Sequence, residues 1–105
     1  MVKIGSFYPN GEGATFDMKY YCEVYVPLLR EWFGEALKKV VVDQGIYGGE
    51  PDAPPFFRAM GQFYFDTEEE GVSAYFSNLS KMAVERPNFT NITPIIQISQ
   101  VIVEE

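Results

Sequence analysis

Three tyrosines are the first side chains in this sequence that could do chemistry. Tyr21 and Tyr25 lie one turn apart on the same face of an expected helix, and Tyr8 ends the strand before it. A phenol, with a pKa of about 10, is a poor base at neutral pH, but it is a good hydrogen-bond donor to a carbonyl or an oxyanion. We therefore predict a pocket in which Tyr25 is a catalytic donor and Tyr8 and Tyr21 bind the ligand. The alternative for each is a core tyrosine whose hydroxyl bonds to a backbone carbonyl.

Asp43 is the ionisable side chain that best fits a catalytic role. It follows a run of three valines at residues 40–42, which favours a strand. A carboxylate in a strand beside an aromatic cavity can have a raised pKa and act as a general base. Two simpler interpretations stay open, an exposed strand residue and a residue paired with Arg58 on the neighbouring strand.

The composition excludes several kinds of catalytic site. The chain contains no histidine, so it has no histidine-based triad, no histidine ligand for haem and no imidazole zinc site. The segment G-I-Y-G-G at 45–49 fits neither the Walker spacing nor the dinucleotide-binding spacing. Glu68, Glu69 and Glu70 are consecutive, so on a helix they point in different directions and cannot converge on a metal ion. We expect neither a metal nor a cofactor.

Charge and hydropathy narrow the range of partners. The 105 residues carry a formal net charge of −7 and no basic cluster, which argues against nucleic acid and against an anionic membrane surface. No apolar run reaches the length of a membrane span, and the N-terminus lacks the apolar segment of a signal peptide. We therefore expect a cytoplasmic protein whose partners include neither nucleic acid nor a membrane.

A helix over residues 17–33 must position two of the tyrosines. Its apolar stripe has the three- and four-residue spacing of a buried helix face and consists of Met18, Tyr21, Tyr25, Leu28 and Trp32. Asp17 is a natural N-cap. Pro27 has no N–H to donate to Glu23, and its ring pushes Val26 out of the helical region, so we predict a kink or a short break in mid-helix.

The order of elements predicts the fold. Strands are expected over residues 2–8, 37–47, 57–65 and 94–103, and helices over residues 17–33 and 67–86. The second helix starts with a capping box, T-E-E-E from Thr67. The βαββαβ order, joined by right-handed crossovers, gives a ferredoxin-like α+β fold with a four-stranded antiparallel sheet and two helices on one face. A chain of 105 residues forms a single domain, residues 1–105.

The second face of this sheet also has to be covered, because the strands carry apolar residues at both odd and even positions, and these point to opposite faces. Phe63 and Phe65 alternate with Tyr64 in one strand. In another, Ile96 alternates with Ile95. The simplest cover is a second copy of the chain, so we predict a homodimer with two sheets face to face.

Short motifs extend over essentially the whole chain. They are Tyr8-Pro9, F-D-x-x-Y-Y at 16–21, Pro27-Leu28, Asp43, Gly45, Gly48-Gly49, Y-F-D at 64–66, N-F-T-N-I at 88–92 and P-I-I-Q-I-S at 94–99. In this order and spacing the chain resembles the EthD family, small dimeric α/β-barrel proteins named from ethyl tert-butyl ether degradation. The resemblance implies a dimeric α/β barrel and adds Tyr64 to the expected ligand-binding residues.

One position departs from the family pattern. Family members commonly carry a histidine two residues before the helix proline, where this chain has Tyr25. The family's best candidate for a general base is therefore absent. The resemblance implies activities that range from an accessory role in an ether-degrading monooxygenase system to polyketide dehydration. The wider superfamily adds cofactor-free monooxygenases, muconolactone isomerases and haem degraders.

Three functions stay open. In the first, the protein binds a small apolar or aromatic, carbonyl-bearing metabolite between the first helix and the sheet. It would then catalyse cofactor-free proton transfer, dehydration or oxygenation, with Tyr25 donating a hydrogen bond and Asp43 moving a proton. In the second, it is a non-catalytic accessory or binding protein of a degradation pathway. In the third, the cavity is filled and the dimer has a purely structural role.

Overall fold

A computed structural model describes all 105 residues of the chain. The strands are β1 (Val2–Pro9), β2 (Leu37–Gln44), β3 (Phe57–Phe65) and β4 (Ile95–Gln100). The helices are α1 (Met18–Tyr20), α2 (Val26–Phe33), α3 (Glu68–Ser77) and α4 (Leu79–Glu85), with a π-helical turn at Tyr21–Tyr25 between α1 and α2. Short 3₁₀ helices at Gly34–Ala36 and Arg86–Asn88 end the two helical regions. Every predicted strand and helix is present, although β2 and β4 are shorter than predicted.

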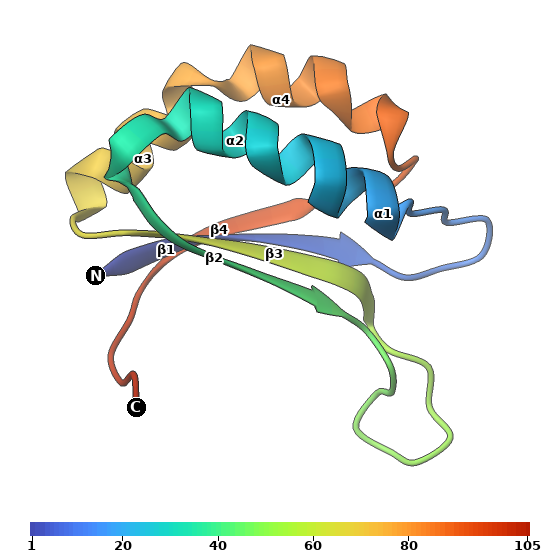
Figure 1. The fold of residues 1–105 in the computed structure, drawn as a ribbon. Coiled ribbons are helices and arrows are strands. Elements are labelled where there is room, and N and C mark those ends of the chain that lie inside the picture. Colours follow the sequence, from blue (N-terminus) through green and yellow to red (C-terminus); the bar gives the residue numbers. More distant parts are fainter.

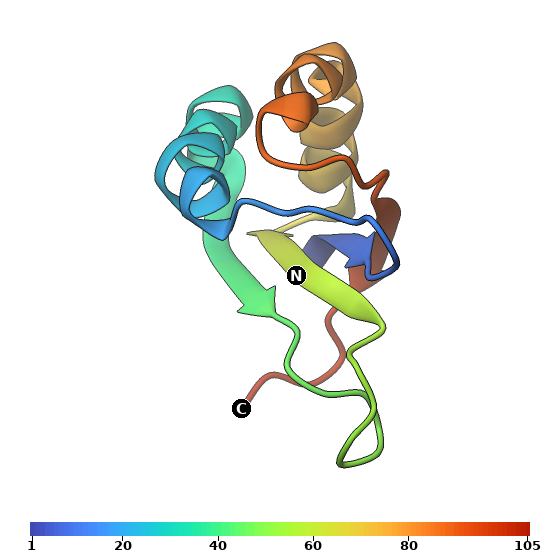
Figure 2. The same cartoon turned by 90° about the vertical axis from the view of Figure 1, so that its right-hand side faces the viewer.

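The strands form one four-stranded sheet in the order β2-β3-β1-β4, and every neighbouring pair is antiparallel. All the helices lie over one face of this sheet, as Figure 1 shows from the side. In the view of Figure 2, the α1–α2 region and the α3–α4 region stand next to each other above the strands. The predicted ferredoxin-like α+β fold is confirmed.

The first helical region is continuous, so the break predicted at Pro27 is wrong, and Val26 keeps a helical backbone conformation with φ −59° and ψ −45°. A π-helical turn precedes the proline, and the Val26 N–H that ends it donates to the Tyr21 carbonyl, five residues back. Pro27 then stands in the first turn of α2, where its missing N–H and its fixed φ are tolerated. The wide turn therefore accommodates the proline within the helix.

The π-helical turn also decides which residues face the sheet. A π turn holds about one residue more than an α turn, so the apolar stripe beyond it moves by one position. The buried residues of this region are Tyr21, Tyr25, Leu29 and Phe33. The predicted stripe continued instead through Leu28 and Trp32, which are only half-buried.

The second helical region begins as predicted but is interrupted. The Glu70 N–H donates to Thr67 Oγ1 at 3.2 Å, and the Thr67 hydroxyl donates to the Glu70 carboxylate at 3.0 Å. At Asn78 the helix breaks into α3 and α4, and the buried Asn78 amide donates to the Ala74 carbonyl at 2.7 Å. None of the helices combines the length and the hydropathy that crossing a bilayer requires.

The other face of the sheet carries no helix (Figure 1). The C-terminal residues turn back beneath it, and Lys39 of β2 pairs with Glu104 there at an N–O distance of 3.7 Å. Apolar side chains also lie on this face, where Phe7 of β1 is the strand partner of Ile95, which is 54% exposed. A second copy of the chain on this face stays a prediction.

Candidate functional site

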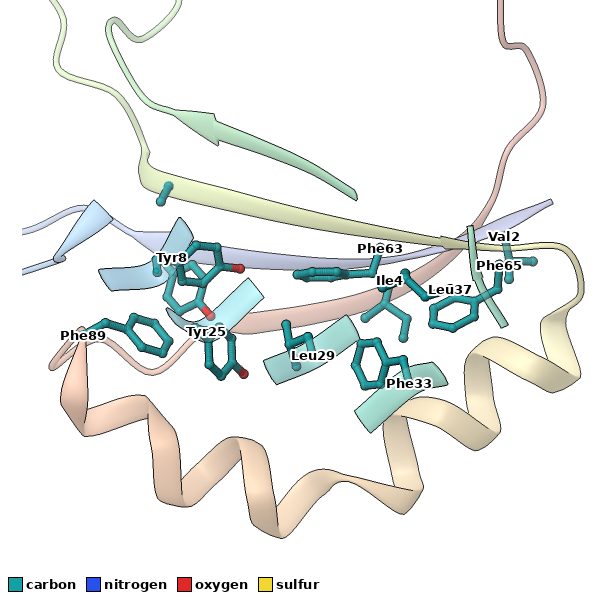
Figure 3. Packing of buried hydrophobic residues seen from close by; sticks show 12 residues of the cluster. Val2, Ile4, Tyr8, Tyr25, Leu29, Phe33, Leu37, Phe63, Phe65 and Phe89 are labelled. Atoms are coloured by element: carbon teal, nitrogen blue, oxygen red, sulfur yellow. The ribbon is translucent and has the colours of Figure 1, made fainter. Parts of the chain in front are cut away.

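A cavity of about 140 Å³ lies between the helices and the sheet. Its wall consists of Ile4, Ser6, Tyr8, Tyr25, Leu29, Phe33, Phe63, Tyr75, Leu79, Met82, Arg86, Pro94 and Ile96. Figure 3 shows part of this wall, with Tyr8 and Tyr25 near one end of the buried cluster and Phe33 near the other. The cavity therefore lies where both helical regions meet β1, β3 and β4.

The size of the cavity suits one ring. An engineered apolar cavity of about 150 Å³ in another protein binds benzene, whereas sites for drug-sized ligands measure roughly 300–1,000 Å³. The wall is mostly apolar, and its polar side-chain atoms come from Ser6, Tyr8, Tyr25, Tyr75 and Arg86. A few polar groups on an apolar wall are typical of a small-molecule site.

The hydroxyl groups of Tyr8 and Tyr25 donate to no acceptor within the chain. Among the tyrosine hydroxyls, only that of Tyr20 forms a hydrogen bond in the chain, to the Glu85 carboxylate. Tyr8 is only 2% exposed and Tyr25 only 5% exposed, so bulk water has little access to either ring. The two donors are therefore available to whatever occupies the cavity.

Burial keeps both phenols protonated. Desolvation raises the pKa of Tyr8 to about 12, although the Tyr21 hydroxyl and the charge of Arg86 act in the opposite direction. Desolvation is also the main reason why the pKa of Tyr25 is raised, and the neighbouring Tyr8 adds to it. At neutral pH both side chains are neutral donors and neither acts as a base.

Tyr21 packs behind this pair and does not line the cavity. Its ring lies 5.8 Å from that of Tyr8 and 5.3 Å from that of Tyr25, between centroids. Its hydroxyl reaches the backbone at Gly61 and has no hydrogen-bond partner. Burial is the largest cause that raises the pKa of Tyr21 well above its ordinary value, followed by the repulsion that its phenolate would meet from ionised Tyr8 or Tyr25. The structure thus brings the three predicted tyrosines together, with Tyr21 in the second layer.

Asp43 and Tyr64 lie on the opposite face of the sheet. Successive side chains of a strand point to opposite faces of the sheet. The strand pairing places Asp43 and Tyr64 at positions whose side chains point away from the helices. The Gln62 side-chain amide donates to Asp43 Oδ2 at 2.8 Å. Arg58, the alternative partner considered for Asp43, donates instead to Asn10 at 3.1 and 2.9 Å. A single chain therefore does not place Asp43 or Tyr64 at the cavity, and their roles stay predictions.

Arg86 is a cavity residue that the sequence patterns do not single out. They identify Arg86 with Pro87 only as the end of the second helix. The structure places Arg86 on the cavity wall and also along an outer groove that Asp17 and Asn88 line. One feature of the sequence could have indicated Arg86. It is a cation at the end of a helix expected to cover the sheet, in a chain that has 8 Lys and Arg residues and 15 Asp and Glu residues.

No family model and no curated protein matches the sequence. Among solved structures, an EthD-like protein from Ralstonia eutropha is 36% identical and has a TM-score of 0.91, over 99% of this chain and 94% of that chain. An EthD family protein from Bacillus halodurans is 21% identical, with a TM-score of 0.66 over 97% of this chain and 99% of that chain. HapK from Hahella chejuensis is 9% identical, with a TM-score of 0.58 over 100% and 97%. The last two share the fold alone, whereas the first, at its identity and coverage, shows that this chain belongs to the EthD-like family.

Proposed function

We propose that this protein binds a small apolar or aromatic molecule that carries a carbonyl or ether oxygen. The hydroxyls of Tyr8 and Tyr25 donate hydrogen bonds to that oxygen. The observation that carries the proposal is the pair of phenol hydroxyls, neither of which donates to an acceptor in the chain, on the mostly apolar wall of a ring-sized cavity. Ethyl tert-butyl ether, from which the family of the Bacillus halodurans protein takes its name, belongs to this ligand class.

The polar groups of the cavity favour stabilisation of negative charge over removal of a proton. Neutral phenols in a buried site stabilise an oxyanion that develops on a carbonyl. No carboxylate lines the cavity, and the chain has no histidine. A cofactor-free dehydration or oxygenation here would therefore rely on Tyr25 as the donor. Turnover that survives Tyr25→Phe would contradict this role, and turnover that also survives Asp43→Asn would contradict the pair of Tyr25 and Asp43 predicted from the sequence.

The lack of a base on the wall supports a second candidate, a non-catalytic accessory protein. Such a protein binds the same ligand class and releases it unchanged. Incubation with an aromatic ketone, followed by mass spectrometry, separates the two candidates. Product formed by the wild type and lost in Tyr25→Phe is expected of an enzyme, and unchanged ketone is expected of an accessory protein.

Ligand binding is tested with two probes of equal size, acetophenone and isopropylbenzene, of which only the first has an oxygen acceptor. Tyr25→Phe and Tyr8→Phe are each expected to weaken acetophenone binding about fivefold, the effect of losing one hydrogen bond of about 1 kcal/mol. Binding of isopropylbenzene should change little. Isothermal titration calorimetry measures both affinities.

The matched control is Tyr47→Phe, because Tyr47 is 69% exposed and does not line the cavity. This variant is expected to bind both probes as the wild type does. Equal affinity of the wild type for the two probes would contradict a role for the phenol donors. Absence of any binding or ligand-dependent stabilisation would favour a purely structural role for the dimer.

The proposal includes a homodimer formed through the helix-free face of the sheet. Apolar Phe7 and Ile95 lie on this face. Its polar side chains already satisfy one another, because Lys3 donates to Gln62 at 2.6 Å and Gln62 donates to Asp43 at 2.8 Å. Burying such a connected polar group costs less than burying unpaired charges.

Light scattering at micromolar concentration is expected to give the mass of a dimer. Ile95→Lys should shift it toward the monomer, because it buries an unpaired ammonium group in the interface. Val84→Lys, which changes an equally apolar side chain on α4 that is 77% exposed, should leave the mass unchanged. A wild-type monomer at this concentration would overturn the proposed dimer.

A further inference from the structure

Arg86 is the one cation on the wall of the cavity. Its positive charge acts on the hydroxyls of both Tyr8 and Tyr25 and lowers the pKa of each against the effect of burial. Arg86 and the two phenols therefore line the same wall, with the guanidinium close enough for its charge to affect both hydroxyls. Together they can surround an oxygen atom of a ligand with donors.

The backbone of Arg86 is fixed, whereas its side chain is not. Its N–H donates to the Met82 carbonyl, and its own carbonyl accepts from the N–H groups of Phe89 and Thr90, both at 3.1 Å. Pro87 follows and restricts the chain further. The guanidinium forms no hydrogen bond within the chain and has no carboxylate within 4.0 Å, since the one ion pair of the structure joins Lys39 and Glu104.

Two carboxylates in the surroundings of Arg86 already accept hydrogen bonds from other donors. Glu85, the preceding residue, accepts from the Tyr20 hydroxyl and from the Asn88 amide. Asp17, across the outer groove, accepts from the Tyr20 N–H at the start of α1. A cation at a helix end interacts favourably with the helix dipole, but this effect does not require the guanidinium to lie on the cavity wall.

From this geometry we infer that Arg86 selects an anionic ligand, a ring-sized apolar molecule whose carboxylate or enolate oxygen binds the guanidinium beside the Tyr8 and Tyr25 hydroxyls. The inference rests on the proposed cavity site and specifies the charge of its ligand. The chain carries a net charge of −7, so its overall field repels anions. A preference for an anion must therefore come from a local group, and Arg86 is the cation in that position.

The test compares benzoate with acetophenone, a neutral ketone of the same size. Wild-type protein is expected to bind benzoate at least about tenfold more tightly, because hydrogen bonds between a guanidinium and a carboxylate are about twice as strong as those between neutral groups and can form in pairs. In Arg86→Gln this preference should disappear while acetophenone affinity stays within about twofold. Arg86→Lys should retain part of the preference, because it keeps the charge but loses the planar pair of donors.

Lys81→Gln is the control for net charge. Lys81 lies on α4, which Arg86 directly follows, but its ammonium group is 5.8 Å from the centroid of the Trp32 ring and Lys81 does not line the cavity. This variant should keep the full preference for benzoate. Loss of the preference in Lys81→Gln, or its survival in Arg86→Gln, would overturn the role of Arg86.

The two proposals fail differently. Acetophenone binding without any preference for benzoate would overturn the anion site and leave the proposed function intact. Failure of both probes to bind the wild type would overturn both.

Discussion

Replacing Gly61 by alanine is expected to lower the free energy of unfolding by about 3 kcal/mol, at the upper end of the cost of overpacking. A Cβ at this position would overlap the Tyr21 hydroxyl and lie 3.1 Å from Cε2 of Phe63. The Tyr21 ring cannot move aside easily, because it is fully buried and packs at 5.1 Å against both Phe16 and Phe89. Urea denaturation at fixed protein concentration, followed through the single tryptophan, measures the loss.

The double variant Tyr21→Phe/Gly61→Ala identifies the cause. Tyr21→Phe removes the hydroxyl that meets the new Cβ, and it also removes a buried polar group without a partner. The single change Tyr21→Phe is therefore expected to be neutral or stabilising. The double variant should recover at least about 1 kcal/mol relative to the sum of the two single changes.

Gly49→Ala is the matched control, because a Cβ at Gly49 meets nothing within 4 Å. Its effect should stay within about 0.5–1 kcal/mol. Gly61→Ala as mild as this control would show that the Tyr21 hydroxyl does not occupy the space beside β3. A strong destabilisation by Tyr21→Phe would show that this hydroxyl has a partner in solution.

The fold could be predicted because its signals are local. Alternation marks the strands, and the Asp17 and Thr67 caps mark the helix starts, both of which form the expected hydrogen bonds. The conformation of the helix at Pro27 could not be predicted in the same way. A break and a π turn both avoid the steric clash and the missing hydrogen bond that a proline causes inside an α-helix. The choice depends on packing, because only the π turn keeps helical residues on the sheet both before and after the proline.

The tyrosines of the site could also be predicted from local signals. Spacing alone places Tyr21 and Tyr25 on one face of the helix, and Tyr8 ends the preceding strand. The position of Asp43 depends instead on an irregularity in the pairing of β2. The register shifts between Leu37 and Lys39, so that Leu37 and Val42 both face the helices although their numbers differ in parity. Without this shift, strict alternation from Leu37 would have placed Asp43 on the helix side.

Arg86 was missed because its role depends on tertiary structure. In the sequence, an arginine followed by a proline is fully explained as the end of a helix. Its position on the cavity wall requires α4 to lie over β1 and β4, where Ser6 and Ile96 complete the same wall. Local sequence patterns therefore predicted the donors provided by the first helical region. They did not predict that the second helical region places the cation Arg86 on the same wall.

Truncating Leu29 to alanine is expected to lower the free energy of unfolding by about 2–5 kcal/mol and to enlarge the cavity. Leu29 is 1% exposed and lines the cavity between Tyr25 and Phe33, one turn away on either side. Removing its isobutyl group joins the vacated volume to the existing space. The variant should therefore accept a longer ligand, and part of the lost stability should return when that ligand binds.

The measurement is the shift in melting temperature caused by acetophenone and by butyrophenone, whose chain is two carbons longer. The wild type is expected to respond more to acetophenone, and Leu29→Ala more to butyrophenone. Leu37→Ala provides the control, because Leu37 is also buried, at 8% exposed, but does not line the cavity. This variant should lose stability without changing its preference between the two ketones. If both leucine variants change the preference alike, the ketones do not bind in the cavity, whereas a change confined to Leu29→Ala places them against the same wall as Tyr25.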